Sequence, residues 1–147
     1  MNERLVHLEQ LLQKRFSGLA HIECALNEVT MTVQSVNYLE IAKQIKVLHE
    51  FGFEQLMDLC GVDYQSYGDG LWTGQRFAAV SHLLSIQNNW RLRFRVMAEQ
   101  DDFPVLPSLT GVWSSANWYE REAFDLFGII FDGHDETKVG LISQMKR

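Results

Sequence analysis

Two neighbouring runs in the middle of the chain alternate between apolar and other residues, and this pattern constrains the fold most. The runs cover residues 76–86 and 91–97, with Asn88 and Asn89 between them. A period of two is typical of β-strands, and paired asparagines are typical of tight turns, so we expect an antiparallel hairpin. The expected faces are Ala78, Val80, His82, Leu84 and Ile86 on the first strand, and Leu92, Phe94 and Val96 opposite Arg91, Arg93 and Arg95 on the second.

Patterns on either side predict further elements. Apolar spacing of three and four residues predicts helices over residues 2–16, 37–51 and 118–127, the first capped by Asn2 and the second ended by Gly52. A second hairpin is expected from two short alternating runs, Ile22, Cys24, Leu26 and Val29, Met31, Val33, with its turn at Asn27 and Glu28. Residues 53–64 predict a helical turn through Leu56 and Leu59 and then a strand at 61–64, and residues 65–75 a loop.

The order helix, hairpin, helix, hairpin, helix contains no βαβ series. We therefore expect an α+β fold, as a two-layer domain with one mixed or antiparallel sheet and helices packed mainly on one face. The 147 residues fit a single domain, and the 46% of hydrophobic residues allows it a core.

Charge and cysteine content exclude several classes of protein. The net charge of −6 disfavours a nucleic-acid binder. The 2 cysteines are far apart and the 5 histidines are scattered, so no metal or iron–sulfur site is expected. No apolar run is long enough to cross a membrane and no signal peptide is evident, so we expect membrane association only through a partner.

The last expected helix has two different faces. Tyr119, Ala123, Leu126 and Phe127 fall on one arc and are expected to face the sheet. Asn117 at the cap position and Glu120 three residues later have the spacing of a capping box. The opposite arc holds Trp118, Arg121, Glu122 and Asp125, which form either a solvated face or a partner interface, because tryptophan and arginine are enriched at interface centres.

The stripe Arg91, Arg93 and Arg95 is the second candidate interface. It is either the solvated face of a half-covered sheet or a surface that meets acidic groups of this chain or of a partner. His82 is expected to be a core histidine with one hydrogen bond. Cys60, His82 and Asp63 could form the nucleophile set of a thiol enzyme, but the neighbouring carboxylates disfavour a thiolate. The sequence contains no nucleotide-binding glycine motif.

Residues 116–131, ANWYEREAFDLFGIIF, with Gly133 and His134 after them, closely resemble the signature of a known family. That family is the 30 kDa subunit of proton-translocating NADH:quinone oxidoreductase, respiratory complex I. The residues that carry the resemblance are Glu120, Arg121, Glu122, Asp125, Leu126, Phe127, Gly128 and His134. Residues 56–64, the strand with His82 and the arginine-rich hairpin also resemble this family, so residues 1–134 are expected to form one such domain.

The resemblance implies a non-catalytic structural subunit of the peripheral arm, on the cytoplasmic side of the bacterial inner membrane. It implies that this chain binds no cofactor, and that NADH, FMN, iron–sulfur clusters and quinone belong to other subunits. The first implied partner is the 49 kDa subunit, which resembles the hydrogenase large subunit. Neither nucleic acid nor direct membrane contact is implied.

The sequence departs from the family after His134. Residues 135–147 lack the proline and the paired arginines of the usual continuation and form an atypical tail. Two alternatives to the complex I assignment stay open at this point. One is the equivalent subunit of a membrane-bound hydrogenase or formate hydrogenlyase complex, and the other is a free-standing thiol enzyme that uses Cys60.

Overall fold

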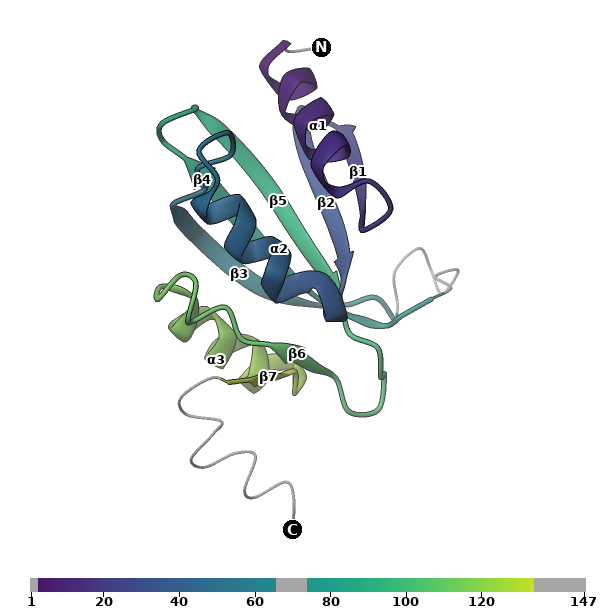
Figure 1. Ribbon diagram of the computed structural model, residues 1–147. Coiled ribbons are helices and arrows are strands. Elements are labelled where there is room, and N and C mark those ends of the chain that lie inside the picture. The colour runs from purple at the N-terminus through teal and green to yellow at the C-terminus, as the bar shows by residue number, and fades with distance from the viewer. Residues whose placement is uncertain (1–2, 66–73, 134–147) are drawn as a thin grey trace.

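The computed structural model describes residues 3–65 and 74–133 and confirms the α+β fold. Helices and strands alternate in short groups along the chain (Figure 1). In order, they are α1 (Glu3–Phe16), β1 (Ala20–Ala25), β2 (Glu28–Gln34), α2 (Ser35–Val47), β3 (Gln55–Asp63), β4 (Phe77–Ser85), β5 (Trp90–Met97), β6 (Val105–Pro107), α3 (Ala116–Phe127) and β7 (Ile130–Asp132).

Five strands form one mixed sheet in the order β1-β2-β5-β4-β3. All neighbours are antiparallel except β2 and β5, which run parallel and join the first hairpin to the strands that follow α2. Strands β6 and β7 form a separate parallel pair. The sequence analysis missed this pair because each strand has only 3 residues, too few for a recognisable alternation.

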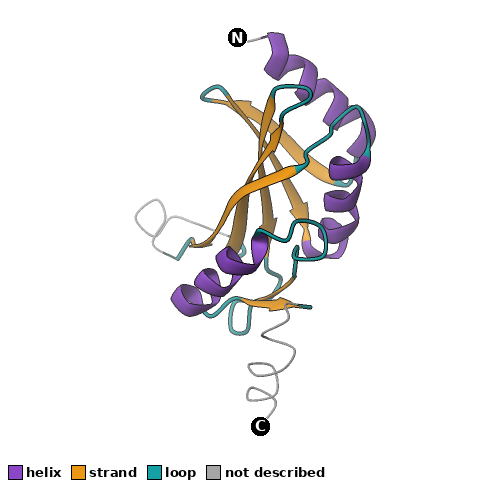
Figure 2. Ribbon diagram, turned by 90° about the vertical axis from the view of Figure 1, so that its left-hand side faces the viewer, coloured by secondary structure: helices purple, strands orange, loops and turns teal. Residues whose placement is uncertain are grey.

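Helices α1 and α2 lie on the same face of the five-stranded sheet, and the opposite face carries neither of them (Figures 1 and 2). This agrees with the expectation of helices mainly on one face. Helix α3 instead packs along the edge strand β3. The core between the helices and the sheet is formed by fully buried side chains, among them Leu8, Leu12 and Phe16 of α1, Tyr38, Ile41 and Ile45 of α2, and Met31 and Phe94 of the sheet.

The first hairpin turns one residue earlier than expected. Its turn is formed by Leu26 and Asn27, with φ of 55° and 62°, and not by Asn27 and Glu28. Two consecutive positive φ angles are typical of the turn whose twist matches a two-residue hairpin. Asparagine tolerates this conformation, but leucine does not favour it, so the sequence did not indicate the position. Leu26 is consequently 100% exposed and does not extend the strand face.

The segment expected to contain a helical turn is part of one continuous strand, β3. Leu56 and Leu59 are three residues apart, which suggested a helix, yet both are buried on the helix-covered face. The strand register shifts between Leu56 and Asp58. Such a bulge inserts one residue, here Met57, and so places two side chains at odd spacing on the same face. Residues 66–73 of the expected loop lie outside the described residues, as does the expected cap Asn2.

The expected core face of β4 was assigned to the wrong set of residues. Strand pairing places Val80 beside Arg95 and His82 beside Arg93, so this set shares the arginine face. The helix-covered face instead includes Ala79 and Leu83. Five consecutive residues of this central strand, Phe77 to Ser81, are buried, so both of its faces include buried side chains. Alternation therefore could not tell the two faces apart.

Three helix boundaries also differ, and the first is the start of α2 at Ser35, two residues before the expected start. Helix α2 ends at Val47, one turn before the expected end, because Leu48 takes up an extended backbone. Helix α3 begins at Ala116 instead of residue 118. The expected cap residue Asn117 therefore lies inside the helix. Ser115 occupies the cap position, but its hydroxyl donates to the Leu56 carbonyl at 2.9 Å. Gly128, with φ of 71°, ends α3 as expected.

The contact between β3 and the end of α3 generates a testable prediction. A Cβ atom on Gly61 would lie 2.7 Å from Phe127 Cδ2 and 3.0 Å from Ile129 Cδ1. We therefore expect Gly61→Ala to lower the free energy of unfolding by about 1–3 kcal/mol, the usual cost of overpacking. Chemical denaturation of the purified chain measures the change.

The matched control is Gly111→Ala, since a Cβ there meets nothing within 4 Å. We expect Gly111→Ala to be nearly neutral and Phe127→Leu to restore part of the stability that Gly61→Ala loses. Equal stability of the two alanine variants would contradict this packing.

Candidate functional site

The exposed face of α3 is the first candidate interaction surface. Trp118 is 65% exposed, and Arg121, Glu122 and Asp125 are also exposed. The structure therefore groups the four residues that the sequence analysis assigned to the outer arc. We call these four residues the α3 outer face.

The inward face of α3 differs from the expected one. Ala123 is buried and Tyr119 is partly buried, as expected. Leu126, however, is 68% exposed, so its assignment to the sheet-facing side was wrong. Phe127 packs against Gly61 but remains 36% exposed.

Glu120 occupies the centre of the inward face, where the sequence analysis had given it a capping role. Its side chain is only 1% exposed. One carboxylate oxygen accepts a hydrogen bond from the Ser108 hydroxyl and the other accepts one from the Leu109 backbone N–H, both at 2.7 Å. Hydrogen bonds to a charged acceptor are stronger than neutral ones. Glu120 therefore ties the segment that follows β6 to α3, and the capping-box interpretation was wrong.

The segment between β6 and α3 is tied to the sheet as well. The Trp113 indole N–H donates to the carbonyl of Phe53 at 2.9 Å in a buried position. Together with the Ser115 hydrogen bond to Leu56, this contact fixes the start of α3 against β3. Two of the residues that hold the outer face in place, Ser108 and Trp113, thus come from the irregular chain before α3. His134 of the family signature and the tail at 135–147 lie outside the described residues.

The second candidate surface is the face of the sheet that α1 and α2 leave uncovered, which we call the open face. Two rows of paired residues cross all five strands on it. One row is Asp58, His82, Arg93, Thr30 and Glu23, and the other is Cys60, Val80, Arg95, Thr32 and His21. The parallel pairing of β2 with β5 therefore places threonines beside the arginines.

The three arginines of the stripe have different surroundings. Arg95 donates from Nε to the Thr32 hydroxyl at 3.0 Å and from a terminal nitrogen to the Tyr64 hydroxyl at 3.1 Å. Arg93 is half-buried and Arg91 is exposed. Within residues 3–65 and 74–133, none of the three lies within ion-pair distance of a carboxylate. The part of the chain that the structure describes therefore does not supply the expected acidic partners.

His82 is not a core histidine, contrary to expectation. Its side chain is 41% exposed on the open face. Its Nδ1 lies 2.7 Å from a carboxylate oxygen of Asp58 and its Nε2 lies 3.7 Å from one of Glu28. The ring therefore lies between carboxylates of β3 and β2, which the sequence separation of these residues did not reveal.

The structure does not assemble the nucleophile set considered for a thiol enzyme. Asp63 pairs with Arg76 at 2.8 Å, and this hydrogen bond holds the pKa of the Asp63 carboxyl below its usual range. His82 contacts Asp58 instead of Asp63. Partial burial, and then the nearby Asp58 carboxylate, raise the pKa of the Cys60 thiol. A raised pKa keeps this thiol protonated at neutral pH and so makes it a poor nucleophile.

The described residues contain no group of three or more His, Cys, Asp or Glu side chains that could hold a metal ion. Among the helices in this part of the chain, none is both long and apolar enough to cross a membrane.

Comparison with known proteins identifies related sequences. A family model described as the 30 kDa subunit of respiratory-chain NADH dehydrogenase matches residues 31–144. Two relatives named as NADH-quinone oxidoreductase subunits, from Burkholderia mallei (strain SAVP1) and Burkholderia pseudomallei (strain K96243), are each 60% identical over 132 residues. These alignments cover 90% of this chain and 64% of each relative, so the chain spans somewhat less than two thirds of their length.

Solved structures have the same fold. The trypsin-resistant fragment (1-134) of Nqo5 matches with a TM-score of 0.74 and 32% identity, over 89% of this chain and 97% of the fragment. A chain from the membrane-bound sulfane sulfur reductase, an archaeal respiratory membrane complex, matches with a TM-score of 0.72 and 18% identity, over 95% of this chain and 76% of its own length. At 18% identity this second similarity concerns the fold alone.

The buried Glu120 carboxylate generates a second prediction. Glu120→Ala leaves the Leu109 N–H and the Ser108 hydroxyl without their acceptor, at a cost of about 1–3 kcal/mol for a buried unsatisfied group. We expect Glu120→Gln to cost less, because it keeps one acceptor oxygen. The control is the exposed Glu122→Ala, expected to change stability by at most about 0.5 kcal/mol. Urea denaturation that shows equal stability for Glu120→Ala and Glu122→Ala would contradict the anchoring role.

The Cys60 thiol generates a third prediction. We expect its alkylation by iodoacetamide to rise with pH at a midpoint above that of an unperturbed thiol, because burial and Asp58 disfavour the thiolate. Asp58→Asn removes the nearby negative charge and should move this midpoint to lower pH. Peptide mass spectrometry separates Cys60 from Cys24. A midpoint below that of an ordinary thiol would instead favour a thiol enzyme.

Proposed function

The chain belongs to the family of the 30 kDa subunit of respiratory-chain NADH dehydrogenase, and we propose that it is a non-catalytic structural subunit of the peripheral arm of membrane-bound NADH:quinone oxidoreductase. In this role the chain positions its neighbours, while the whole complex couples electron transfer from NADH to quinone with proton translocation. The observation that carries the proposal is the α3 outer face, which lies within the family signature.

The α3 outer face has the composition of an interface and a rigid support. A largely exposed tryptophan beside arginine fits a docking surface, because these two residue types dominate the binding energy of interfaces. The helix underneath is fixed by Glu120 and by the close approach of Phe127 to Gly61. A rigid helix loses little conformational entropy on binding, which favours affinity.

We propose the 49 kDa subunit of the same complex as the partner of this surface. The support is the family resemblance, together with relatives that are named as NADH-quinone oxidoreductase subunits. In this proposal NADH, FMN, iron–sulfur clusters and quinone are bound by other subunits. The chain then lies at the cytoplasmic side of the bacterial inner membrane and reaches the membrane only through the complex.

The two alternatives have less support. Relatives with 60% identity carry the name of NADH-quinone oxidoreductase, which favours that complex over a hydrogenase or formate hydrogenlyase. The raised pKa of Cys60 and the distance of Asp63 from the His82 cluster along β3 disfavour a thiol enzyme.

The proposal is tested with Trp118→Ala in the tagged chain, purified with its complex from native membranes. Truncating a tryptophan at an interface centre typically costs 2 kcal/mol or more of binding energy, so we expect about a 30-fold lower recovery of the 49 kDa subunit by quantitative mass spectrometry. The melting temperature of the free chain should be nearly unchanged, because Trp118 is 65% exposed. We expect Arg121→Ala to act in the same direction.

Val36→Ala on α2 serves as the control, because Val36 is also an exposed apolar residue, at 79%, but lies on another helix. It should affect neither recovery nor melting. If Trp118→Ala unfolds the free chain, the residue is structural. If wild-type chain recovers no other subunit of an NADH:quinone oxidoreductase, the proposed function is wrong.

A further inference from the structure

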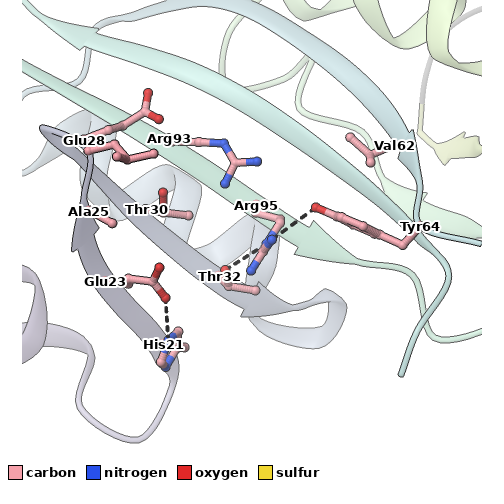
Figure 3. A pocket seen from close by; sticks show the side chains of 11 residues that line it. His21, Glu23, Ala25, Glu28, Thr30, Thr32, Val62, Tyr64, Arg93 and Arg95 are labelled. Atoms are coloured by element: carbon pink, nitrogen blue, oxygen red, sulfur yellow. Dashed lines mark hydrogen bonds and ion pairs between the residues drawn. The ribbon is translucent and has the colours of Figure 1, made fainter. Parts of the chain in front are cut away.

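The open face contains a cavity of about 470 Å³ between β1, β2, β5 and the end of β3. Thr30, Thr32, Arg93, Arg95 and Tyr64 are among the residues that line it. In Figure 3 the guanidinium of Arg93 projects over the sheet between Glu28 and Arg95. The cavity's lining residues include Thr30, Arg93, Thr32 and Arg95 of the open face. Helices α1 and α2 lie on the other face of the sheet (Figure 2) and so do not cover the cavity.

The charged side chains that line this cavity differ in their neighbours. Glu23 lies 3.4 Å from His21, and Glu28 lies 3.7 Å from His82, so each glutamate of the lining faces an imidazole. Arg95 is held by two hydroxyl groups. Arg93 has no hydrogen-bond or ion-pair partner among residues 3–65 and 74–133. Arg93 is a half-buried residue that lines the cavity, and its guanidinium presents its N–H donors there.

A carboxylate is the complementary group for these donors. A guanidinium binds a carboxylate through two parallel hydrogen bonds, and a cation that is partly withdrawn from water gains more from such a pair than a fully exposed one. The neighbouring Arg95 adds a second positive charge. Its side chain is already held by two hydrogen bonds, so binding a carboxylate nearby does not have to order it further.

The rim of the cavity favours a protein over a free anion. Leu26 is fully exposed at the tip of the first hairpin and lines the cavity beside Ala25, while Val62 lines it from β3. A small anion would bury little of this apolar rim on binding. A peptide segment would bury more of it and so gain hydrophobic stabilisation.

We propose that this cavity of the open face is a second docking site, which receives an acidic segment of a neighbouring subunit and binds its Asp or Glu carboxylate through Arg93. The proposal rests on the proposed function, since it places the chain in a complex. It adds a surface and a partner chemistry that the α3 outer face does not provide.

The test compares Arg93→Gln with Arg91→Gln in the tagged chain purified with its complex. Both variants remove one arginine charge from the same face of β5, but Arg91 lies outside this cavity. We expect Arg93→Gln to lower recovery of the neighbouring subunit at least about tenfold, and Arg91→Gln to change it less than about twofold. Thermal unfolding of both free variants checks that folding is intact.

A photo-crosslinking amino acid in place of Thr30 identifies what occupies the cavity. The expected product links the chain to an Asp- or Glu-containing segment of another subunit. A crosslink only within the chain itself, or no crosslink together with equal recovery of the two variants, overturns the proposal. So does binding of free glutamate or phosphate at Arg93, measured by calorimetry, if no subunit crosslinks.

The two hypotheses fail in different ways. If wild-type chain co-purifies with the complex but Arg93→Gln does so equally well, only the docking surface is wrong. If wild-type chain recovers no other subunit, both the proposed function and the docking surface fall. If Arg93→Gln unfolds the free chain, Arg93 is a structural residue and the inference is overturned.

Discussion

The parallel pairing of β2 with β5 determines how the rest of the molecule is arranged. It joins the first hairpin to the three strands that follow α2, which are otherwise separate in sequence. A parallel pair needs a long connection that crosses the sheet, and α2 forms part of that connection. Because α1 and α2 both lie on one face, neither helix covers the other face (Figure 2). The register of this pair then sets Thr30 beside Arg93 and Thr32 beside Arg95.

The second constraint is the burial of Glu120. A carboxylate can be buried only when its oxygens are hydrogen-bonded, and here the chain segment before α3 supplies the donors. That segment is therefore held in one conformation, and with it the orientation of α3. The family signature thus contains two kinds of residue. Glu120 acts inward on the fold, whereas Trp118, Arg121, Glu122 and Asp125 face outward.

The sequence predicted an element correctly where its apolar residues recur with a clear period and only one of its sides is buried. Helix α1 and strand β5 satisfy this condition, since each has one buried and one more exposed side. The prediction failed where the pattern had a second physical cause. The bulge at Met57 places Leu56 and Leu59 on one face of a strand at the three-residue spacing that is typical of a helix. Strand β4 has apolar residues on both faces, so its alternation did not identify the buried face. The sequence also marked the exposed residues of the α3 outer face. The partners of Glu120 and His82 are 11 to 54 residues away along the chain, which no local pattern can show.

The α3 outer face and the open face are neighbours, because α3 packs along β3 and Cys60 of β3 belongs to the open face. Partial burial raises the pKa of the Cys60 thiol most, the Asp58 carboxylate raises it further, Arg93 of the open face lowers it, and Glu122 of the α3 outer face raises it. The edge strand β3 is therefore a short border between both surfaces. A partner that covers the border removes water from Cys60 and from Arg93 together, which strengthens any carboxylate contact to Arg93 as the local dielectric falls.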